Sequence, residues 1–112
     1  MRIVDKPWGR EIWWAVTDRY VGKILEVKAG QALSLQYHRE KLETLLFYQG
    51  EGILVLGEEM MAVHPMEAYT IQPGTRHRIT ATSDLTVFEV STTQVDDVVR
   101  LEDLYGRTEG QS

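Results

Sequence analysis

The chain has 112 residues, enough for one domain with a hydrophobic core but too few for a second catalytic domain. Its net charge of −5 argues against a protein that tracks nucleic-acid phosphates, although an acidic protein can still have a locally basic pocket. It has no cysteine, which excludes disulfides, thiolate metal sites and thiol catalysis. No segment reaches membrane-spanning length, and residues 1–10 lack the apolar core of a signal peptide. We therefore expect a cytoplasmic protein with no membrane partner.

Short apolar or alternating runs, separated by turn residues, predict an all-β fold. In chain order the expected strands are Ile12–Val16, Tyr20–Val27, Leu33–His38, Glu43–Tyr48, Ile53–Leu56, Met60–Val63, Tyr69–Ile71, His77–Ala81 and Thr86–Val90. Residues 96–104 are expected to form one or two helical turns, and residues 108–112 a frayed polar tail. Strands this short in so small a chain close most naturally into a single β-barrel or jelly roll.

The third expected strand places two polar side chains on one face. Gln36 and His38 are two residues apart, and that spacing points both side chains the same way. Glu43 follows after a short polar connection, and His77 follows the turn at residues 73–76. An amide oxygen, two imidazoles and a carboxylate can together hold a divalent metal. Convergence of Gln36, His38, Glu43 and His77 on one spot inside the barrel is therefore a central prediction.

Each member of this set also has a structural interpretation. A single histidine in a strand is more often a hydrogen-bonded structural residue than a ligand. Gln36 could hydrogen-bond a metal-bound water instead of binding the metal. Glu43 could hydrogen-bond one of the metal ligands instead of binding the metal itself. His64 has no partner at useful spacing, so we expect it in a surface turn.

Other residues outside this set also allow two interpretations. Glu89 shares a face with Val87 and Ser91 in an apolar strand. On an inward face it would be either a paired structural charge or a functional carboxyl with a raised pKa. Three tryptophans lie near the N-terminus: Trp8, Trp13 and Trp14. We expect them to be buried in the barrel or in a homodimer interface at an N-terminal edge strand. Stacking on a sugar is the less favoured interpretation.

Two motifs resemble those of the cupin superfamily. The first runs from Gly30 through Gln36, His38 and Glu43 to Gly50, and the second is Pro73–His77. Glutamine in place of the usual first histidine resembles the zinc ligands of phosphomannose isomerases. The similarity extends to the isomerase domain of the bifunctional mannose-6-phosphate isomerase/mannose-1-phosphate guanylyltransferases. The further segments that carry it are Lys6–Gly9, Leu33–Gln36, Asp96–Arg100 and Asp103–Arg107. Two departures are Lys41, where that group has arginine, and a rewritten segment at residues 91–95.

The resemblance implies a cupin domain over residues 1–107 and a metal held by Gln36, His38, Glu43 and His77. Zinc is the first expectation, with manganese, iron or nickel as alternatives. The implied function is isomerisation of a sugar phosphate, in the manner of mannose-6-phosphate isomerase. An iron-dependent oxygenase, using two histidines and one carboxylate, is one alternative, and a non-catalytic sugar-binding cupin is another.

An isomerase also needs a proton carrier and a cation for the phosphate. Candidates for the proton carrier are Glu89, Lys23 and Tyr69. Candidates for the phosphate are Arg39, Lys41 and Arg100, with Arg100 first because it lies in the segment that resembles the isomerases.

Overall fold

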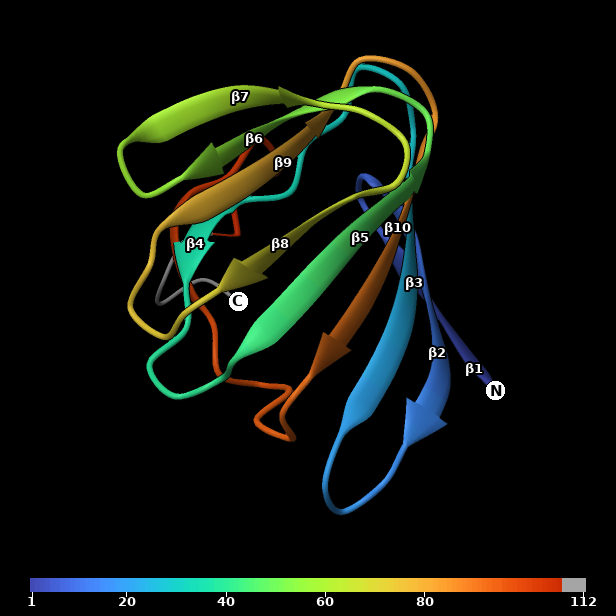
Figure 1. Cartoon of the computed structure of the whole chain (residues 1–112), viewed down its shortest axis with the longest axis vertical. Coiled ribbons are helices and arrows are strands. Elements are labelled where there is room, and N and C mark those ends of the chain that lie inside the picture. Colours follow the sequence, from blue (N-terminus) through green and yellow to red (C-terminus); the bar gives the residue numbers. More distant parts are fainter. Residues whose placement is uncertain (108–112) are drawn as a thin grey trace.

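Residues 1–107, which the computed structural model describes, form two antiparallel β-sheets that face each other (Figure 1). One sheet has six strands in the order β1-β2-β3-β10-β5-β8, and the other has five in the order β11-β4-β9-β6-β7. The strands are β1 Arg2–Lys6, β2 Gly9–Val16, β3 Val21–Val27, β4 Leu35–Tyr37, β5 Glu43–Gln49, β6 Gly52–Leu56, β7 Glu59–Val63, β8 Glu67–Ile71, β9 His77–Ala81, β10 Leu85–Ser91 and β11 Val99–Glu102. This part of the chain contains no helix with the length and apolar character needed to span a membrane.

The inward faces of β5, β9 and β10 change from polar to apolar along each strand. The polar inward residues are Glu43, His77 and Glu89. The apolar residues on the same faces follow the polar one in β5 and β9 and precede it in β10; they are Leu45, Phe47, Ile79, Ala81, Val87 and Leu85. Because residues two apart on a strand share a face, the polar positions gather at one end of the sandwich. The other end becomes the hydrophobic core.

The core depends on close packing between the sheets. Phe47 has no exposed surface and meets Tyr69 edge to face, with ring centroids 6.0 Å apart. Truncating such a buried ring costs about 3–5 kcal/mol. At Gly50, with φ +92°, a Cβ would lie 2.1 Å from the carbonyl oxygen of Asp84. Only glycine therefore fits where β5 ends and the chain turns toward β6.

The prediction of an all-β, single-domain fold is confirmed, and each expected strand is present with modest shifts at its ends. The prediction of helical turns at residues 96–104 is wrong. Val99 and Arg100 belong to strand β11, where they pair with Tyr37 and Gln36 of β4. Strand β1 was also missed, since its short mixed sequence becomes a strand through pairing with β2. The domain boundary at residue 107 stays an expectation, and the tail at residues 108–112 lies outside the described residues.

Candidate metal centre

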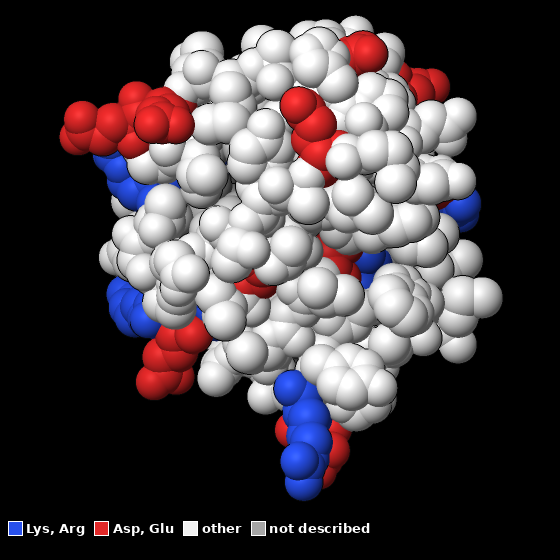
Figure 2. Space-filling model, in the orientation of Figure 1, with Lys and Arg blue, Asp and Glu red and all other residues white. Residues whose placement is uncertain are grey.

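A cavity of about 660 Å³ lies at the polar end of the sandwich. Both sheets line it, through residues such as Trp13, Lys23 and Glu89 on one side and Gln36 and His77 on the other. Figure 2 shows the surface in the same orientation as Figure 1. Near the middle of this face, acidic and basic atoms are set back among uncharged side chains. The cavity is thus a polar space lined by acidic and basic side chains from both sheets.

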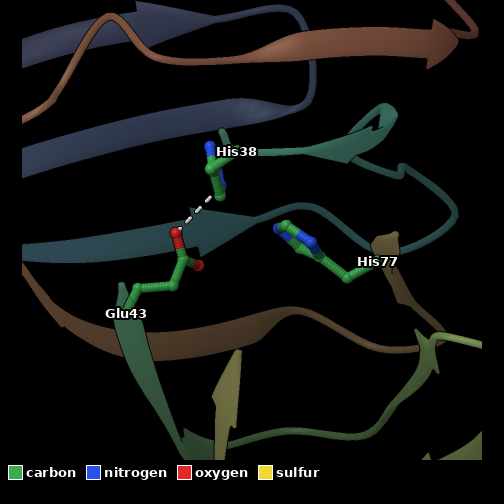
Figure 3. A group of neighbouring side chains, drawn as sticks. All are labelled: His38, Glu43 and His77. Atoms are coloured by element: carbon green, nitrogen blue, oxygen red, sulfur yellow. Dashed lines mark ion pairs between the residues drawn. The ribbon is translucent and has the colours of Figure 1, made fainter. Parts of the chain in front are cut away.

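His38, Glu43 and His77 converge beside this cavity from three different strands (Figure 3). His38 directly follows β4, Glu43 begins β5 and His77 begins β9. All three are buried, and one donor atom from each lies within 4.8 Å of the others. Donors that share one ion at about 2.1 Å are roughly 3–4 Å apart, so small side-chain movements would close this group around a metal.

Both imidazole rings are oriented by backbone carbonyl groups. His38 Nδ1 donates to the carbonyl oxygen of Asp97, 2.5 Å away, and His77 Nδ1 donates to that of Thr75, 3.0 Å away. A carbonyl oxygen can only accept, so Nδ1 carries the proton and Nε2 is left as the donor atom of each neutral ring. Burial, the largest cause, lowers the pKa of His77 and favours that neutral form. Metal-binding histidines are typically oriented in this way.

Glu43 faces two nitrogen atoms with the same buried oxygen. Its Oε1 lies 3.1 Å from His38 Nε2 and 3.2 Å from Lys41 Nζ. Although burial opposes ionisation, the nearby His38 imidazole and the charge of Lys41 outweigh it and lower the pKa of Glu43 to about 2. The side chain is therefore a carboxylate at neutral pH, which is the form that binds a cation.

Two buried carboxylate oxygens lack a properly angled hydrogen bond within residues 1–107. They are Glu43 Oε1 and Glu89 Oε2, although each has a charged nitrogen within 3.2 Å. Moreover, a neutral His38 would turn the Nε2 lone pair toward Glu43, which is repulsive unless a proton or a cation lies between them. A divalent ion bound by His38, Glu43 and His77 would satisfy Glu43 Oε1 and the His38 lone pair, so the residues present fit a metal.

Gln36 lies next to the three converging residues. It is opposite His77 in the β4–β9 pairing and opposite Arg100 in the β4–β11 pairing. Directly opposed residues of antiparallel strands share a face. Gln36, His77 and Arg100 accordingly all line the cavity, in a row across three strands.

Lys41 occupies a buried position between two acids, 3.2 Å from Glu43 and 3.2 Å from Glu89. Burial disfavours its charge, but Glu89 and Glu43 outweigh burial and raise its pKa. Burial and then the charge of Glu43 raise the pKa of Glu89, against the opposing effect of Lys41. Glu89 is thus both a paired charge and a carboxyl with a raised pKa, so the two interpretations of this residue coexist.

The remaining candidates fall in different places. Lys23 and Arg100 line the cavity, whereas Tyr69 packs against the core. His64 is exposed and pairs with Glu51 across 2.6 Å, as expected of a surface position. Lys41 also lines the cavity, where its ammonium group forms ion pairs with Glu43 and Glu89.

The tryptophans divide among three environments. Trp8 is a core residue, Trp14 is half exposed, and Trp13 lines the cavity between Arg2 and Lys23, whose cationic groups lie 4.9 Å and 4.1 Å from its ring. Sequence reasoning missed this position of Trp13. The spacing could have indicated it, because Glu11 and Trp13 are two residues apart on β2 and both line the cavity.

Asp97 was also missed, and it organises the turn that presents His38. Its carboxylate accepts hydrogen bonds from the backbone N–H groups of Arg39, Glu40 and Lys41 at 2.7–3.0 Å. Although burial opposes its charge, these three donors together lower the pKa of Asp97 to about 2. No local pattern pairs Asp97 with residues 39–41, because 56 to 58 residues separate them.

Comparison with known sequences gives one family over most of the chain. The family described as "Mannose-6-phosphate isomerase C-terminal" matches residues 1–103. The Xanthan biosynthesis protein XanB of Xanthomonas campestris pv. campestris is 33% identical over 96% of this chain. Mannose-1-phosphate guanylyltransferase ManC of Salmonella typhimurium is 32% identical over 95%. This chain spans about a quarter of these curated relatives, 24% and 23% of their lengths.

Solved structures with the same fold are more distant in sequence. KdgF from a Halomonas species has a TM-score of 0.77 at 18% identity, covering 86% of this chain and 91% of that one. A cupin superfamily protein from Desulfitobacterium hafniense has a TM-score of 0.67 at 15% identity, covering 73% and 74%. The capsular polysaccharide assembling protein CapF of Staphylococcus aureus has a TM-score of 0.76 at 19% identity, covering 90% and 34%. At these identities the likeness establishes the fold.

Proposed function

The chain belongs to the mannose-6-phosphate isomerase C-terminal family and has a cupin fold, and from this premise we propose that it is a metal-dependent sugar-phosphate isomerase. Mannose 6-phosphate is the first substrate to test. The observation that carries the proposal is the buried group of His38, Glu43 and His77 beside a cavity of about 660 Å³. That volume lies within the usual range for small-molecule sites.

The proposed metal ligands are His38, Glu43 and His77, with Gln36 as the fourth donor. This mixture of nitrogen and oxygen donors suits zinc first, with manganese, iron or nickel as alternatives. When bound, the ion would supply Lewis-acid stabilisation of the negative charge that develops on the substrate oxygens. Support comes from the Nδ1 hydrogen bonds, which leave Nε2 of each ring as the atom that can bind a metal, and from the buried Glu43 oxygen that lacks a hydrogen bond.

Glu89 is the proposed carrier of the proton between adjacent carbons of the sugar. Its pKa is raised whereas that of Glu43 is about 2, so the two carboxyls suit different tasks. Glu43 stays an anion, and Glu89 can take up and release a proton at a pH closer to neutrality. Lys23 is less suited, because its ammonium group is already held 3.7 Å from Glu11 and 4.1 Å from the Trp13 ring.

Arg100 is the proposed cation for the phosphate. It lines the cavity one strand beyond Gln36 and two strands from His77. A guanidinium group presents paired donors that match a phosphate. Because phosphate binding acts on substrate and transition state alike, we expect Arg100→Ala to raise KM more than it lowers kcat.

The activity test is deuterium incorporation from solvent at C2 of a panel of aldose phosphates, using metal-loaded protein. We expect turnover on at least one phosphorylated hexose, its abolition in His38→Ala, and a loss of about 10²–10⁴-fold in kcat for Glu89→Gln. The control variant His64→Ala changes an exposed imidazole and should retain full activity.

Absence of exchange above the His38→Ala blank for every sugar phosphate would reject the isomerase. Oxygen consumption with bound iron would then favour an oxygenase, because two histidines and one carboxylate also suit that metal. Binding of a sugar without turnover would favour a non-catalytic cupin.

A further inference from the structure

Three cationic side chains from separate segments line the cavity. Lys6 ends β1, Arg100 lies in β11, and Arg107 follows the turn after β11. Their charges are close enough to interact. Burial is the largest cause that lowers the pKa values of Lys6 and Arg100. The charge of Arg107 lowers both pKa values further, and the charge of Arg100 also lowers that of Lys6. Like charges held together in a half-buried space repel one another, so an anion placed among them is favoured.

Little in the described residues neutralises this group. Within residues 1–107, Lys6 and Arg100 have neither an ion pair nor a side-chain hydrogen bond. Glu11 is the acid with the largest effect on Lys6, but its carboxylate accepts a hydrogen bond from Trp13 Nε1 at 3.0 Å and lies 3.7 Å from Lys23 Nζ. Asp103 is the acid with the largest effect on Arg100, but both of its carboxylate oxygens already accept hydrogen bonds from Arg107. Two positive charges therefore face the cavity without partners of their own.

Arg107 is the one member of the group with a fixed orientation. Its Nε and one terminal nitrogen donate to the two carboxylate oxygens of Asp103, at 3.1 Å and 3.2 Å. The Asp103 side chain is fully buried, while that of Arg107 keeps 22% of its surface exposed. This leaves further guanidinium donors available to a ligand in the cavity.

From this geometry we infer that Lys6, Arg100 and Arg107 form a binding site for a phosphoryl dianion. Arg100 is two strands from His77, and adjacent strands are about 4.8 Å apart, so their backbones are separated by roughly 10 Å. A sugar with its reacting carbons at His38, Glu43 and His77 can thus present a phosphoryl group on its far end to the three cations. The identity of the ligand as a sugar phosphate rests on the proposed function, whereas the anion site itself does not.

The test is isothermal titration calorimetry on the purified full chain freed of metal, with three ligands: mannose 6-phosphate, mannose and inorganic phosphate. We expect mannose 6-phosphate to bind, mannose to bind at least tenfold more weakly, and inorganic phosphate to compete. Lys6→Gln and Arg107→Gln should each weaken mannose 6-phosphate about 10- to 100-fold, as for loss of a charge-assisted hydrogen bond.

The matched control is Arg19→Gln, which removes the same charge from an exposed turn between β2 and β3. It should change the affinity less than twofold. Lys6→Arg, which keeps the charge, should restore most of the affinity lost in Lys6→Gln. Asp103→Asn makes the protein more positive yet should weaken binding, because it frees Arg107; a gain in affinity would point to unspecific charge attraction. Thermal melting of each variant checks that it is folded.

The outcomes separate this inference from the proposed function. Phosphate-dependent binding that is lost in Lys6→Gln and Arg107→Gln supports the site even if no sugar is isomerised. Equal binding of mannose and mannose 6-phosphate, or unchanged affinity in both variants, would overturn it. Binding of inorganic phosphate with no gain from the sugar would keep an anion site and overturn its assignment to a sugar phosphate.

Discussion

At the scale of single residues, the environment gives similar side chains different properties. Glu43 and Glu89 are both buried and both contact Lys41, yet the pKa of Glu43 is lowered to about 2 and that of Glu89 is raised. Burial raises both pKa values, but His38, Lys41 and His77 together lower that of Glu43, whereas the charge of Glu43 adds to the effect of burial at Glu89. One carboxyl is thereby prepared to bind a cation and the other to hold a proton.

Metal binding through the proposed ligands has a consequence for stability. We expect His77→Ala to lose bound zinc and to lose the rise in melting temperature that zinc gives the wild type. An ion bound only by the folded state stabilises it by about 2.7 kcal/mol at one hundred times its Kd. Elemental analysis of untagged protein and thermal melting with and without a chelator measure both effects.

The control for this prediction is His64→Ala, which removes an imidazole on the surface and should change neither property. Unchanged zinc content in His77→Ala would place the metal elsewhere.

Asp97 gives the fold a dependence on pH. Its folded-state pKa is about 2, below the ordinary value of 3.8, so its charge stabilises the fold above about pH 4 and this contribution is lost as the pH falls toward 2. We expect Asp97→Asn to melt below the wild type at neutral pH, with the difference shrinking between about pH 4 and pH 2. Scanning calorimetry of metal-free protein across that range measures it, with Asp18→Asn in an exposed turn as the control.

A difference in melting temperature that stays constant through this range would show that the Asp97 charge is unimportant. The turn at residues 39–41 would then be held by the shape of the side chain rather than by its ionisation.

At the scale of elements, β11 brings the C-terminal segment into the cavity wall. It pairs with β4. Arg78 on β9 holds β11 in place by donating hydrogen bonds to the carbonyl oxygens of Leu33 and Glu102, both at 3.0 Å. The contact carries Arg100 to the same face as Gln36 and His77. An edge strand of four residues thus places one of the proposed phosphate ligands.

Removing the Arg78 hydrogen bonds should loosen β11 and leave the proposed metal ligands intact. We expect Arg78→Met, which keeps the aliphatic stem, to destabilise the fold by about 1–3 kcal/mol through lost charge-assisted hydrogen bonds. Hydrogen exchange should accelerate at Val99 and Arg100 more than at Leu45 or Val87. Uniform acceleration at all four amides would instead indicate a global loss of stability.

At the scale of the whole molecule, an apolar row crosses the outer face of the six-stranded sheet. Ile3, Ile12, Ile24, Phe88 and Leu46 are opposed in sequence from β1 to β5. Near the β1 edge the large side chains are well exposed, with Ile3 at 58%, Trp14 at 49% and Val16 at 62%. Of the three tryptophans expected in the barrel or in a homodimer interface, Trp8 is in the core and Trp13 lines the cavity, and Trp14 is exposed on this face.

We predict a two-fold homodimer through this outer face and the β1 edge, because a two-fold contact lets the same apolar row meet itself. Sedimentation velocity at micromolar to high-micromolar concentration should give a dimer for the wild type and a monomer for Ile3→Asp. Met60→Asp, on an exposed position of the other sheet, is the control and should remain dimeric. A monomeric wild type at high micromolar concentration contradicts the prediction.

The fold class and the candidate metal ligands could be predicted from the sequence alone. Strand alternation put Gln36 and His38 on one face, turn residues marked where strands reverse, and both features are local. The contacts that tertiary structure decided join distant segments: Asp97 with residues 39–41, Lys41 between two acids, Lys6 beside Arg107, and β11 against β4. Such contacts depend on how the two sheets close over one another, and periodicity along one strand carries no information about its distant partners.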